Sequence, residues 1–364
     1  IPLAKDIPAL QDVSLNLAGR RAKYSDFDAG DSWKIGLNWQ IVDSVRFRGT
    51  LSSDFRAPNM NNLYEPLGVT STGFQDRLTG GSNQGQRLVT GGNPLLTPET
   101  AKTVTAGLVF TPSFLERFSF AVDYYETRLE NAITQISYQN DAIQGLCLAT
   151  APAYNSPFCQ LAERPLSPGD PNYTNPALNM PTQIRNSPVN SALIKTRGFD
   201  FQIDYNVDLW GGQFSFRHLA NYQPTNSTLN TPASTFYTWA VQPHLMQTTF
   251  INYSNSGWSV ALANRWLSNV SLKTSDNRLN AANGGNQNYV DSSLDAYDVV
   301  DVTLGKNFEF GDSSVEAYLT VNNLLDERAP LFPSNSGLPG LFYPTLGIYD
   351  DMGRYFTLGF RSKF

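Results

Sequence analysis

The chain ends in an alternating stretch, Arg354-Tyr355-Phe356-Thr357-Leu358-Gly359-Phe360-Arg361-Ser362-Lys363-Phe364. A period of two residues, with one apolar and one polar face, is the pattern of a β-strand that separates two different media. The stretch ends on an aromatic residue, and no turn residue follows it. Aromatic girdles on amphipathic strands are typical of membrane-spanning β-barrels. The stretch therefore favours a transmembrane barrel. Its apolar set is Phe356, Leu358, Phe360 and Phe364, with Ser362 as the exception.

The composition supports strands and turns and excludes several classes of protein. The 364 residues include 22 Phe, 17 Tyr, 6 Trp, 27 Gly and 22 Pro, which is a strand-and-turn composition. Mean hydropathy is −0.31, and no apolar run approaches the roughly 18 residues that a transmembrane helix needs. The formal net charge of −6 argues against nucleic acid as the main partner, because phosphate binding needs a basic face.

Twelve segments of the chain alternate in the same way and predict twelve antiparallel, up-and-down strands. The clearest runs from Phe199 to Val207, where apolar residues alternate with acidic and amide residues. In the eighth segment two apolar sets compete, so its facing stays open between Phe250 and Ile251. The segments are 13–17, 33–41, 45–51, 104–110, 118–124, 199–207, 214–222, 244–253, 258–266, 300–304, 315–321 and 355–364.

Short and long connections alternate along the chain. All long connections therefore leave from one rim of the sheet and all short turns from the other. Outer-membrane barrels are built with short periplasmic turns and long extracellular loops. The terminal strand runs from the long-loop rim to the short-turn rim, so this alternation predicts a periplasmic C-terminus. The polar faces of the strands would then point into a lumen. The first long connection is 20–32, and the extracellular loops are expected near 57–102, 131–195, 223–243, 268–296 and 326–353.

Cysteine and histidine usage gives two further hypotheses. Cys147 and Cys159 lie in one polar, proline-rich segment without a histidine nearby to complete a metal site. The pair predicts a disulfide formed in an oxidising compartment, with two free thiols as the alternative. His218, with a serine on a neighbouring strand, is the one candidate for a lipid hydrolase. A histidine that is simply hydrogen-bonded or at a membrane interface is the favoured interpretation.

The common signatures of enzymes are missing from the sequence. It contains no Gly-x-x-x-x-Gly-Lys-Ser/Thr loop, no His-Glu-x-x-His and no Gly-x-Ser-x-Gly. We therefore predict no enzyme activity, no cofactor and no metal site.

Four motifs follow one another along the chain, and together they carry a family resemblance. They are Ser53-Asp54-Phe55-Arg56-Ala57-Pro58-Asn59, Asn93-Pro94-Leu95-Leu96-Thr97-Pro98-Glu99, Val321-Asn322-Asn323-Leu324-Leu325-Asp326 and the aromatic-ended terminal strand. In this order the chain resembles TonB-dependent outer-membrane receptors over nearly its whole length. Pro58 removes a ladder donor and stops a strand, and Pro94 and Pro98 bracket the return to the sheet. We interpret these motifs as shaping loops and strand ends.

The resemblance implies the C-terminal part of a barrel of about 22 strands with a plugged lumen. Twelve strands could also close by themselves. No signal peptide is visible, and we expect the N-terminal plug and the segment that binds the energising protein to be missing from this sequence. The resemblance further implies the outer membrane of a Gram-negative bacterium. It also implies uptake of a scarce large solute (siderophore, cobalamin, oligosaccharide or similar) into the periplasm, driven by a TonB-type inner-membrane protein.

The expected partners are outer-membrane lipid, the plug, the TonB-type protein, an extracellular small or medium-sized ligand and the barrel assembly machinery. The residues expected to serve barrel assembly are Tyr355, Phe356, Leu358, Phe360 and Phe364. Aromatic rings with amide neighbours stack sugars or hold a siderophore. The candidate ligand contacts in the long loops are Tyr64, Tyr154, Tyr237, Trp239, Phe342 and Tyr343. For any one of them, loop packing is the favoured interpretation.

Three other classes stay open beside the receptor. A passive porin would share the barrel without the plug. A lipid hydrolase would need a paired serine and histidine. A structural role within a larger envelope assembly would need neither.

Overall fold

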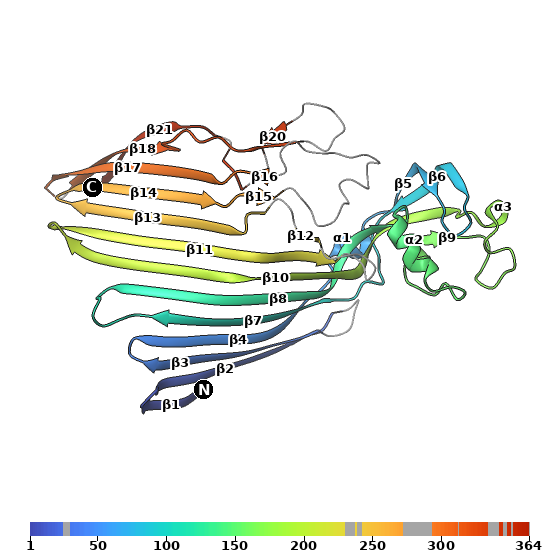
Figure 1. Ribbon diagram of the computed structural model, residues 1–364, viewed down its shortest axis with the longest axis horizontal. Helices are drawn as coiled ribbons and strands as arrows, with labels where there is room; N and C mark the ends of the chain where they lie inside the picture. The colour runs from blue at the N-terminus through green and yellow to red at the C-terminus, as the bar shows by residue number, and fades with distance from the viewer. Residues whose placement is uncertain are drawn as a thin grey trace.

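One antiparallel sheet makes up most of the protein. The computed structural model describes residues 1–24, 30–229, 237–238, 242–271, 293–311, 313–333, 342–344, 348–350 and 352–363. Within these residues the main ladder of the sheet ends at β1 and β21, and it is not closed. Thirteen of its strands pair antiparallel in chain order (Figure 1). They are β1 (Pro2–Ile7), β2 (Leu10–Ala22), β3 (Gly30–Val42), β4 (Val45–Arg56), β7 (Glu99–Phe110), β8 (Phe118–Ser137), β10 (Gln183–Leu209), β11 (Gly212–Leu229), β13 (Leu245–Asn255), β14 (Trp258–Leu267), β17 (Tyr297–Phe310), β18 (Ser313–Asn322) and β21 (Tyr355–Lys363).

All twelve alternating segments of the sequence form strands of this sheet, which confirms the all-β, antiparallel prediction. The structure adds β1, which has adjacent charges at Lys5 and Asp6 and no regular alternation. β1 pairs with β2 across a tight turn in which Ala9 has a φ of 64°. Because its sequence lacks the period of two, alternation could not predict this strand.

The alternation of short and long connections is visible in Figure 1, where the tight turns lie at one end of the sheet. Two of these turns have positive φ at both central residues: 51° and 74° at Trp210 and Gly211, and 49° and 77° at Ser256 and Gly257. This combination is the type I′ turn, whose twist matches that of the flanking strands. Glycine adopts such φ values without steric cost, so Gly211 and Gly257 allow the chain to reverse in only two residues.

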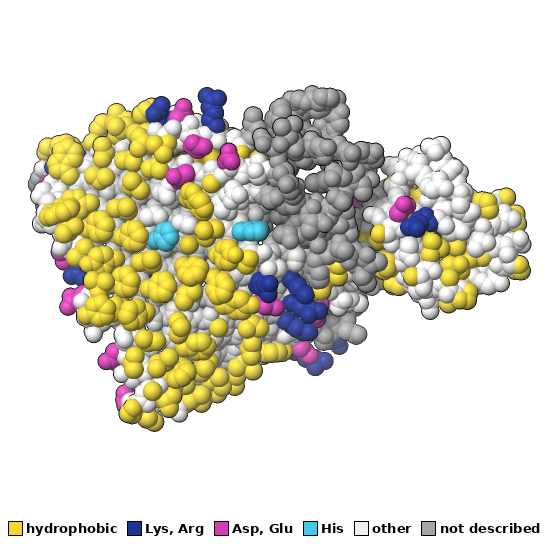
Figure 2. Space-filling model, viewed as in Figure 1, with side chains coloured by type: hydrophobic (Ala, Val, Ile, Leu, Met, Phe, Trp, Pro, Cys, Tyr) yellow, Lys and Arg dark blue, Asp and Glu magenta, His cyan; other side chains and the backbone are white. Residues whose placement is uncertain are grey.

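One face of the sheet is apolar from strand to strand. Ile251 lies opposite Phe216 and Leu262, so it belongs to this face, while Phe250 lies opposite Arg217 on the other face. The facing of β13 is thereby settled. Figure 2 shows hydrophobic side chains spread over the strands. Soluble proteins rarely expose a continuous apolar surface, so this face is suited to lipid. Its exposed members include Trp33, Leu51, Leu108, Trp258, Leu304, Phe356, Leu358 and Phe360.

The opposite face is polar and carries ion pairs that cross the strands. Arg48 on β4 forms a bidentate pair with Asp123 on β8, with N···O distances of 2.8 and 2.5 Å. Gly107 on β7 lies between them in register. A Cβ at Gly107 would collide with the Asp123 carboxylate, so glycine is what allows the pair to form across β7. This face therefore has the charged, hydrated character expected of a barrel lumen.

The long connections contain regular elements of their own. None of the helices that the structure describes is long and apolar enough to cross a membrane. β8 and β10 run well beyond the alternating segments that predicted them, into the range 131–195. The short elements are α1 (Met60–Tyr64), β5 (Gly68–Gln75), β6 (Ser82–Thr90), α2 (Asp141–Leu148), η1 (Cys159–Leu161), β9 (Ala162–Glu163), α3 (Pro176–Asn179), β12 (Tyr237–Thr238), β15 (Val270–Ser271), β16 (Ser293–Leu294), β19 (Leu331–Pro333) and β20 (Phe342–Pro344).

Candidate functional site

Two of the long connections fold together into a unit that we call the outer platform. It consists of β5, β6, α2, η1, β9 and α3 with the outer ends of β8 and β10, and it projects beyond the long-loop end of the sheet (Figure 1). The hairpin β5–β6 is joined to β10 by a parallel pairing, in which Leu88 lies opposite Ile184. Segments about 100 residues apart in sequence therefore form one sheet in the platform.

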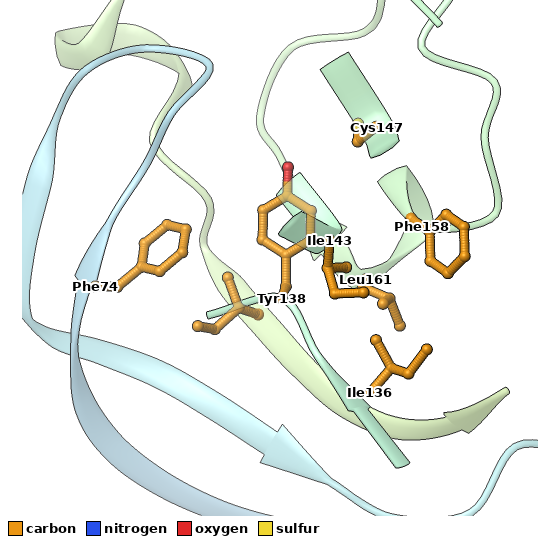
Figure 3. Close-up of a cluster of buried hydrophobic side chains, with 8 residues drawn as sticks. Phe74, Ile136, Tyr138, Ile143, Cys147, Phe158 and Leu161 are labelled. Atoms are coloured by element: carbon orange, nitrogen blue, oxygen red, sulfur yellow. The ribbon is translucent and has the colours of Figure 1, made fainter. Parts of the chain in front are cut away.

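The platform has a hydrophobic core, drawn in Figure 3. Ile184 is fully buried at the centre, and Tyr138 is 1% exposed. The predicted disulfide between Cys147 and Cys159 is present and joins α2 to η1 beside this core. A disulfide that closes a loop of this length stabilises the folded form by about 3 kcal/mol, mainly by restricting the unfolded chain. The buried set is Phe74, Ile136, Tyr138, Ile143, Cys147, Phe158, Leu161 and Ile184.

A buried ion pair holds the platform together from the other side. Arg164 binds Asp76 in a bidentate manner at 2.7 and 2.8 Å, and the two side chains are 5% and 0% exposed. Burial by itself would raise the pKa of Asp76, but the guanidinium of Arg164 outweighs burial and lowers that pKa below its ordinary value. Asp76 also accepts a hydrogen bond from the Thr79 hydroxyl at 2.7 Å, and Arg164 donates to the Asn179 carbonyl at 2.8 Å. Both carboxylate oxygens of Asp76 and both terminal nitrogens of Arg164 thus have partners, as a stable buried ion pair requires.

The first two sequence motifs bind to one another where the platform joins the sheet. Arg56 of the first motif pairs with Glu99 of the second, and Glu99 is 1% exposed. The other carboxylate oxygen of Glu99 accepts a hydrogen bond from the Ile133 backbone N–H at 2.6 Å. Asn59 caps α1 and forms a capping box with Asn62, which satisfies two orphan donors of the helix. These motifs shape the exit of the chain from the sheet and its return.

The third motif has a similar structural role between β18 and β21. Asn323 is 1% exposed and has a φ of 50°, a left-handed conformation that asparagine tolerates better than most residues. Its side chain both donates to the Glu327 carbonyl and accepts from the Glu327 N–H, at 2.7 and 2.9 Å. Asp326 accepts a hydrogen bond from the Arg354 backbone N–H at 2.9 Å. The motif therefore ties the last long connection to the top of the terminal strand.

A cavity of about 570 Å³ lies between the second motif, η1 and β10. Leu96, Phe158 and Leu161 provide its apolar wall, and all three are buried. Arg185 also lines the cavity. It is half-buried, and its guanidinium has no hydrogen bond or ion pair within the described part of the chain. The volume falls in the range of small-molecule sites. An unpaired guanidinium beside an apolar wall can bind an anionic group on a partly apolar molecule.

The six aromatic residues predicted as ligand contacts lie in different environments or outside the described side chains. Tyr64 is in α1 and is 48% exposed. Tyr154 packs its ring on Tyr173 with centroids 4.9 Å apart and lies against the platform core. No ring contact among the described residues joins these two tyrosines. Tyr237 is in β12, and the structure does not describe its side chain. The structure does not describe the side chains of the other three predicted contacts, Trp239, Phe342 and Tyr343.

Neither Arg164 nor Arg185 was found from the sequence. Their partners and neighbours are far away in the chain, and no local pattern marks them. Asp76 and Arg164, for example, are separated by 88 residues.

The hydrolase hypothesis needs a serine hydrogen-bonded to His218, and the part of the chain that the structure describes shows none. His218 Nδ1 lies 2.9 Å from the hydroxyl of Thr249, and its ring is stacked on Phe216. Both side chains are on the apolar face. His218 is two residues from Phe216 on β11, and Thr249 is two residues from Ile251 on β13. The favoured interpretation of a hydrogen-bonded strand histidine fits this geometry.

The comparisons with known proteins agree with this architecture. The family description "TonB dependent receptor-like, beta-barrel" matches residues 4–324. Similar solved structures include the siderophore receptor PirA from Acinetobacter baumannii, with a TM-score of 0.61 at 16% identity over 97% of this chain and 43% of that one. A mutant of the ferric enterobactin receptor PfeA from Pseudomonas aeruginosa, in complex with enterobactin, has a TM-score of 0.64 at 14% identity, over 98% of this chain and 44% of that one. No curated protein matches the sequence. The chain therefore spans less than half the length of these structures, and the likeness is one of fold.

Proposed function

Because the chain belongs to the TonB-dependent receptor β-barrel family, we propose that it is the C-terminal part of an active receptor for a siderophore-type solute. Barrels of this family are outer-membrane transporters and not enzymes. The solute would bind at the outer platform and pass through the lumen to the periplasm with TonB-coupled energy. The long-loop rim would then be extracellular, and the C-terminus periplasmic.

The observation that carries this proposal is the cavity beneath the platform. A ferric siderophore is a bulky chelate with anionic oxygen ligands around the metal. Arg185 offers an unpaired cation, and Leu96 and Phe158 offer an apolar wall. A volume of about 570 Å³ would hold part of such a chelate. The rigid core and disulfide of the platform would keep these groups in place before the ligand arrives, which reduces the entropy lost on binding.

The two open edges support the proposal that further strands complete the barrel. β1 and β21 each pair on one side only among the described residues. An unpaired edge cannot lie in lipid, because its backbone groups would have no hydrogen-bond partners there. Strands from an N-terminal part would pair with both edges, and a plug would fill the lumen. The barrel assembly machinery would act on β21, which carries four of the residues predicted for it, from Tyr355 to Phe360. Phe364 lies outside the described residues.

The proposal can be tested by measuring the binding of ferric chelates to the full-length receptor. A catecholate chelate (ferric enterobactin) and a hydroxamate chelate (ferrichrome) would be compared by tryptophan fluorescence quenching. We expect a Kd below about 1 μM for at least one of them, since specific recognition at low solute levels needs roughly 8 kcal/mol or more. The substitution Arg185→Gln should weaken binding at least about tenfold, because it removes the charge-assisted contact.

The control is Arg87→Gln, which removes one exposed cation of the platform without touching the cavity. It should leave Kd within about twofold. Uptake of the bound chelate by cells should stop when the proton gradient is collapsed, while surface binding persists. Uptake that continues without the gradient would identify a passive porin and would overturn the proposal.

A further inference from the structure

The cavity beneath the platform lies between two segments that side-chain hydrogen bonds hold together. One is the loop of residues 92–97, which contains most of the second motif, and the other is part of β10. At the start of the loop, Asn93 donates from Nδ2 to the Pro188 carbonyl of β10 at 2.9 Å. At its end, Thr97 is bound by the side chain of Asn190 on β10. The loop is therefore fixed to β10 at both ends, and we call Asn93 and Asn190 the asparagine clamp.

Asn190 binds Thr97 in the way that a neighbouring strand would. Its Oδ1 accepts a hydrogen bond from the Thr97 backbone N–H at 2.8 Å, and its Nδ2 donates to the Thr97 carbonyl at 2.8 Å. Nδ2 also donates to the Asn131 carbonyl of β8 at 2.9 Å. An asparagine supplies one acceptor and two N–H donors at this reach, whereas aspartate has no donor and glutamine is longer by one methylene. Both N–H donors of Asn190 are thus used within the protein, so its role is to hold the loop.

The backbone around Asn190 is irregular, which explains how its side chain reaches two segments. The register between β8 and β10 shifts between Asn190 and Ala192, and Asn131 has a φ of 54°. In a regular strand the side chains stand roughly perpendicular to the sheet. A bulge re-aims a side chain, and bulges are over-represented next to functional sites. The irregularity therefore allows Asn190 to bind the loop and β8 at once.

The loop has little freedom between its two fixed ends. The ring of Pro94 fixes its backbone φ. Oδ1 of Asn93 accepts a hydrogen bond from the Leu95 N–H at 3.0 Å, which closes a tight turn. Leu96 follows, and it is 4% exposed and belongs to the apolar wall of the cavity. The position of Leu96, and with it the width of the cavity, therefore depends on the asparagine clamp.

From this geometry we propose that the asparagine clamp sets the width of the cavity and thereby the size of the solute that the receptor accepts. Asn93 and Asn190 are positioning residues, because they act through the loop. A loop that is fixed beforehand loses no freedom when a fitting ligand binds. A larger ligand would have to displace the loop, so the clamp discriminates against it. The proposal rests on the transport function given above.

Hydrogen exchange of the full-length receptor tests the clamp without a ligand. In Asn190→Ala we expect exchange of the Leu96 N–H to accelerate at least about fivefold. Leu96 donates to the Asn93 carbonyl at 3.3 Å, a bond that the substitution does not remove. Faster exchange at Leu96 therefore reports opening of the whole loop. The matched control is Asn186→Ala on the same strand, outside the cavity lining, where exchange should stay within about twofold of the unmodified receptor.

Chelate binding tests the effect of the clamp on recognition. Ferric enterobactin and ferrichrome differ in size and shape, and their two Kd values give one ratio for each receptor. In Asn190→Ala this ratio should move at least about fivefold toward one, because a loosened loop discriminates less. A residue needed only for folding would reduce the amount of active receptor and leave the ratio unchanged. The control Asn186→Ala should keep the ratio of the unmodified receptor.

Three results would overturn the proposal: unchanged exchange at Leu96 in Asn190→Ala, an unchanged Kd ratio in that variant, or a ratio near one in the unmodified receptor. If the unmodified receptor bound neither chelate, the transport proposal would fail, and the exchange measurement would still decide whether the clamp controls the cavity. Should Asn190→Ala make the platform sensitive to protease, Asn93→Ala replaces it in both measurements. That variant removes the bond to Pro188 and leaves the Asn190–Thr97 pairing in place.

Discussion

The sheet and the outer platform are built for different surroundings, although one chain forms both. Along the sheet, large apolar side chains such as Leu358 and Phe360 are about two-thirds exposed, and charged pairs such as Arg48 and Asp123 line the opposite face. In the platform the order is reversed. Ile184 and Tyr138 are buried, and even the Asp76–Arg164 ion pair is inside.

The difference shows which forces hold each part. The strands of the sheet satisfy their backbone groups by pairing, and their apolar face is stabilised by lipid. The platform is stabilised as a small soluble domain would be. It has a limited core, and it adds a disulfide and a buried ion pair, as small domains often must. Mutations should therefore act on one part while leaving the other intact.

The largest expected effect comes from breaking the buried ion pair. Arg164→Leu leaves the Asp76 carboxylate buried without its partner, which costs about 3–5 kcal/mol. We expect the platform to become sensitive to protease within residues 138–182, while the sheet keeps its resistance to heat and detergent. Limited proteolysis followed by mass spectrometry measures the first property, and heat-dependent migration in gel electrophoresis measures the second.

The matched control replaces both partners, as Asp76→Leu/Arg164→Met. Removing both charges avoids the buried unpaired carboxylate, so this variant should be less sensitive to protease than Arg164→Leu alone. A double variant as sensitive as the single one would mean that size and shape, and not charge, make the pair important.

The same contrast explains what the sequence could predict. Strands of the sheet face lipid on one side and water on the other. The sequence of each such strand therefore alternates between apolar and polar residues with a period of two. The twelve alternating segments account for all but one of the thirteen strands that pair in chain order, the exception being β1. The outer ends of β8 and β10 lose that alternation, because protein surrounds them in the platform. Bulges at Asn190 and Ala192 shift the register there as well.

The candidate site could be predicted only in part. The disulfide was accessible because Cys147 and Cys159 are close in sequence. The cavity was not, because it is formed by the second motif, η1 and β10, three segments that meet only after folding. Arg56 and Glu99 were both quoted in motifs, but nothing in either motif indicated that the two would form an ion pair.

The next effect concerns the apolar face of the sheet. Leu358→Arg places a charge among lipid chains, which costs about 2–4 kcal/mol at the bilayer midplane and less near its surface. Thr357→Arg, on the adjacent residue of β21, should cost less than about 1 kcal/mol because its side chain faces the hydrated lumen. Urea titration of both variants in lipid vesicles measures the difference. Equal costs at the two positions would contradict the assignment of lipid and lumen faces.

The smallest expected effect is a dependence of the platform on acid. The folded pKa of Asp76 is lowered, chiefly because the effect of Arg164 outweighs that of burial. A carboxyl group with a lowered folded pKa contributes stability above its unfolded pKa of about 3.9, and that contribution is lost as pH falls through the folded value. Protease sensitivity of the platform should therefore rise below about pH 4, with an acid-active protease such as pepsin as the probe.

The sheet should keep its heat-dependent migration over the same pH range, since lipid contact with Leu358 or Phe360 does not titrate. The variant Asp76→Leu/Arg164→Met provides the control, because it has no carboxyl at this position and its own sensitivity should change less with pH. If the unmodified platform and this variant loosened in parallel as pH fell, the acid response would belong to other carboxylates. The buried pair would then be a contributor to stability at neutral pH without being the group that acid disrupts.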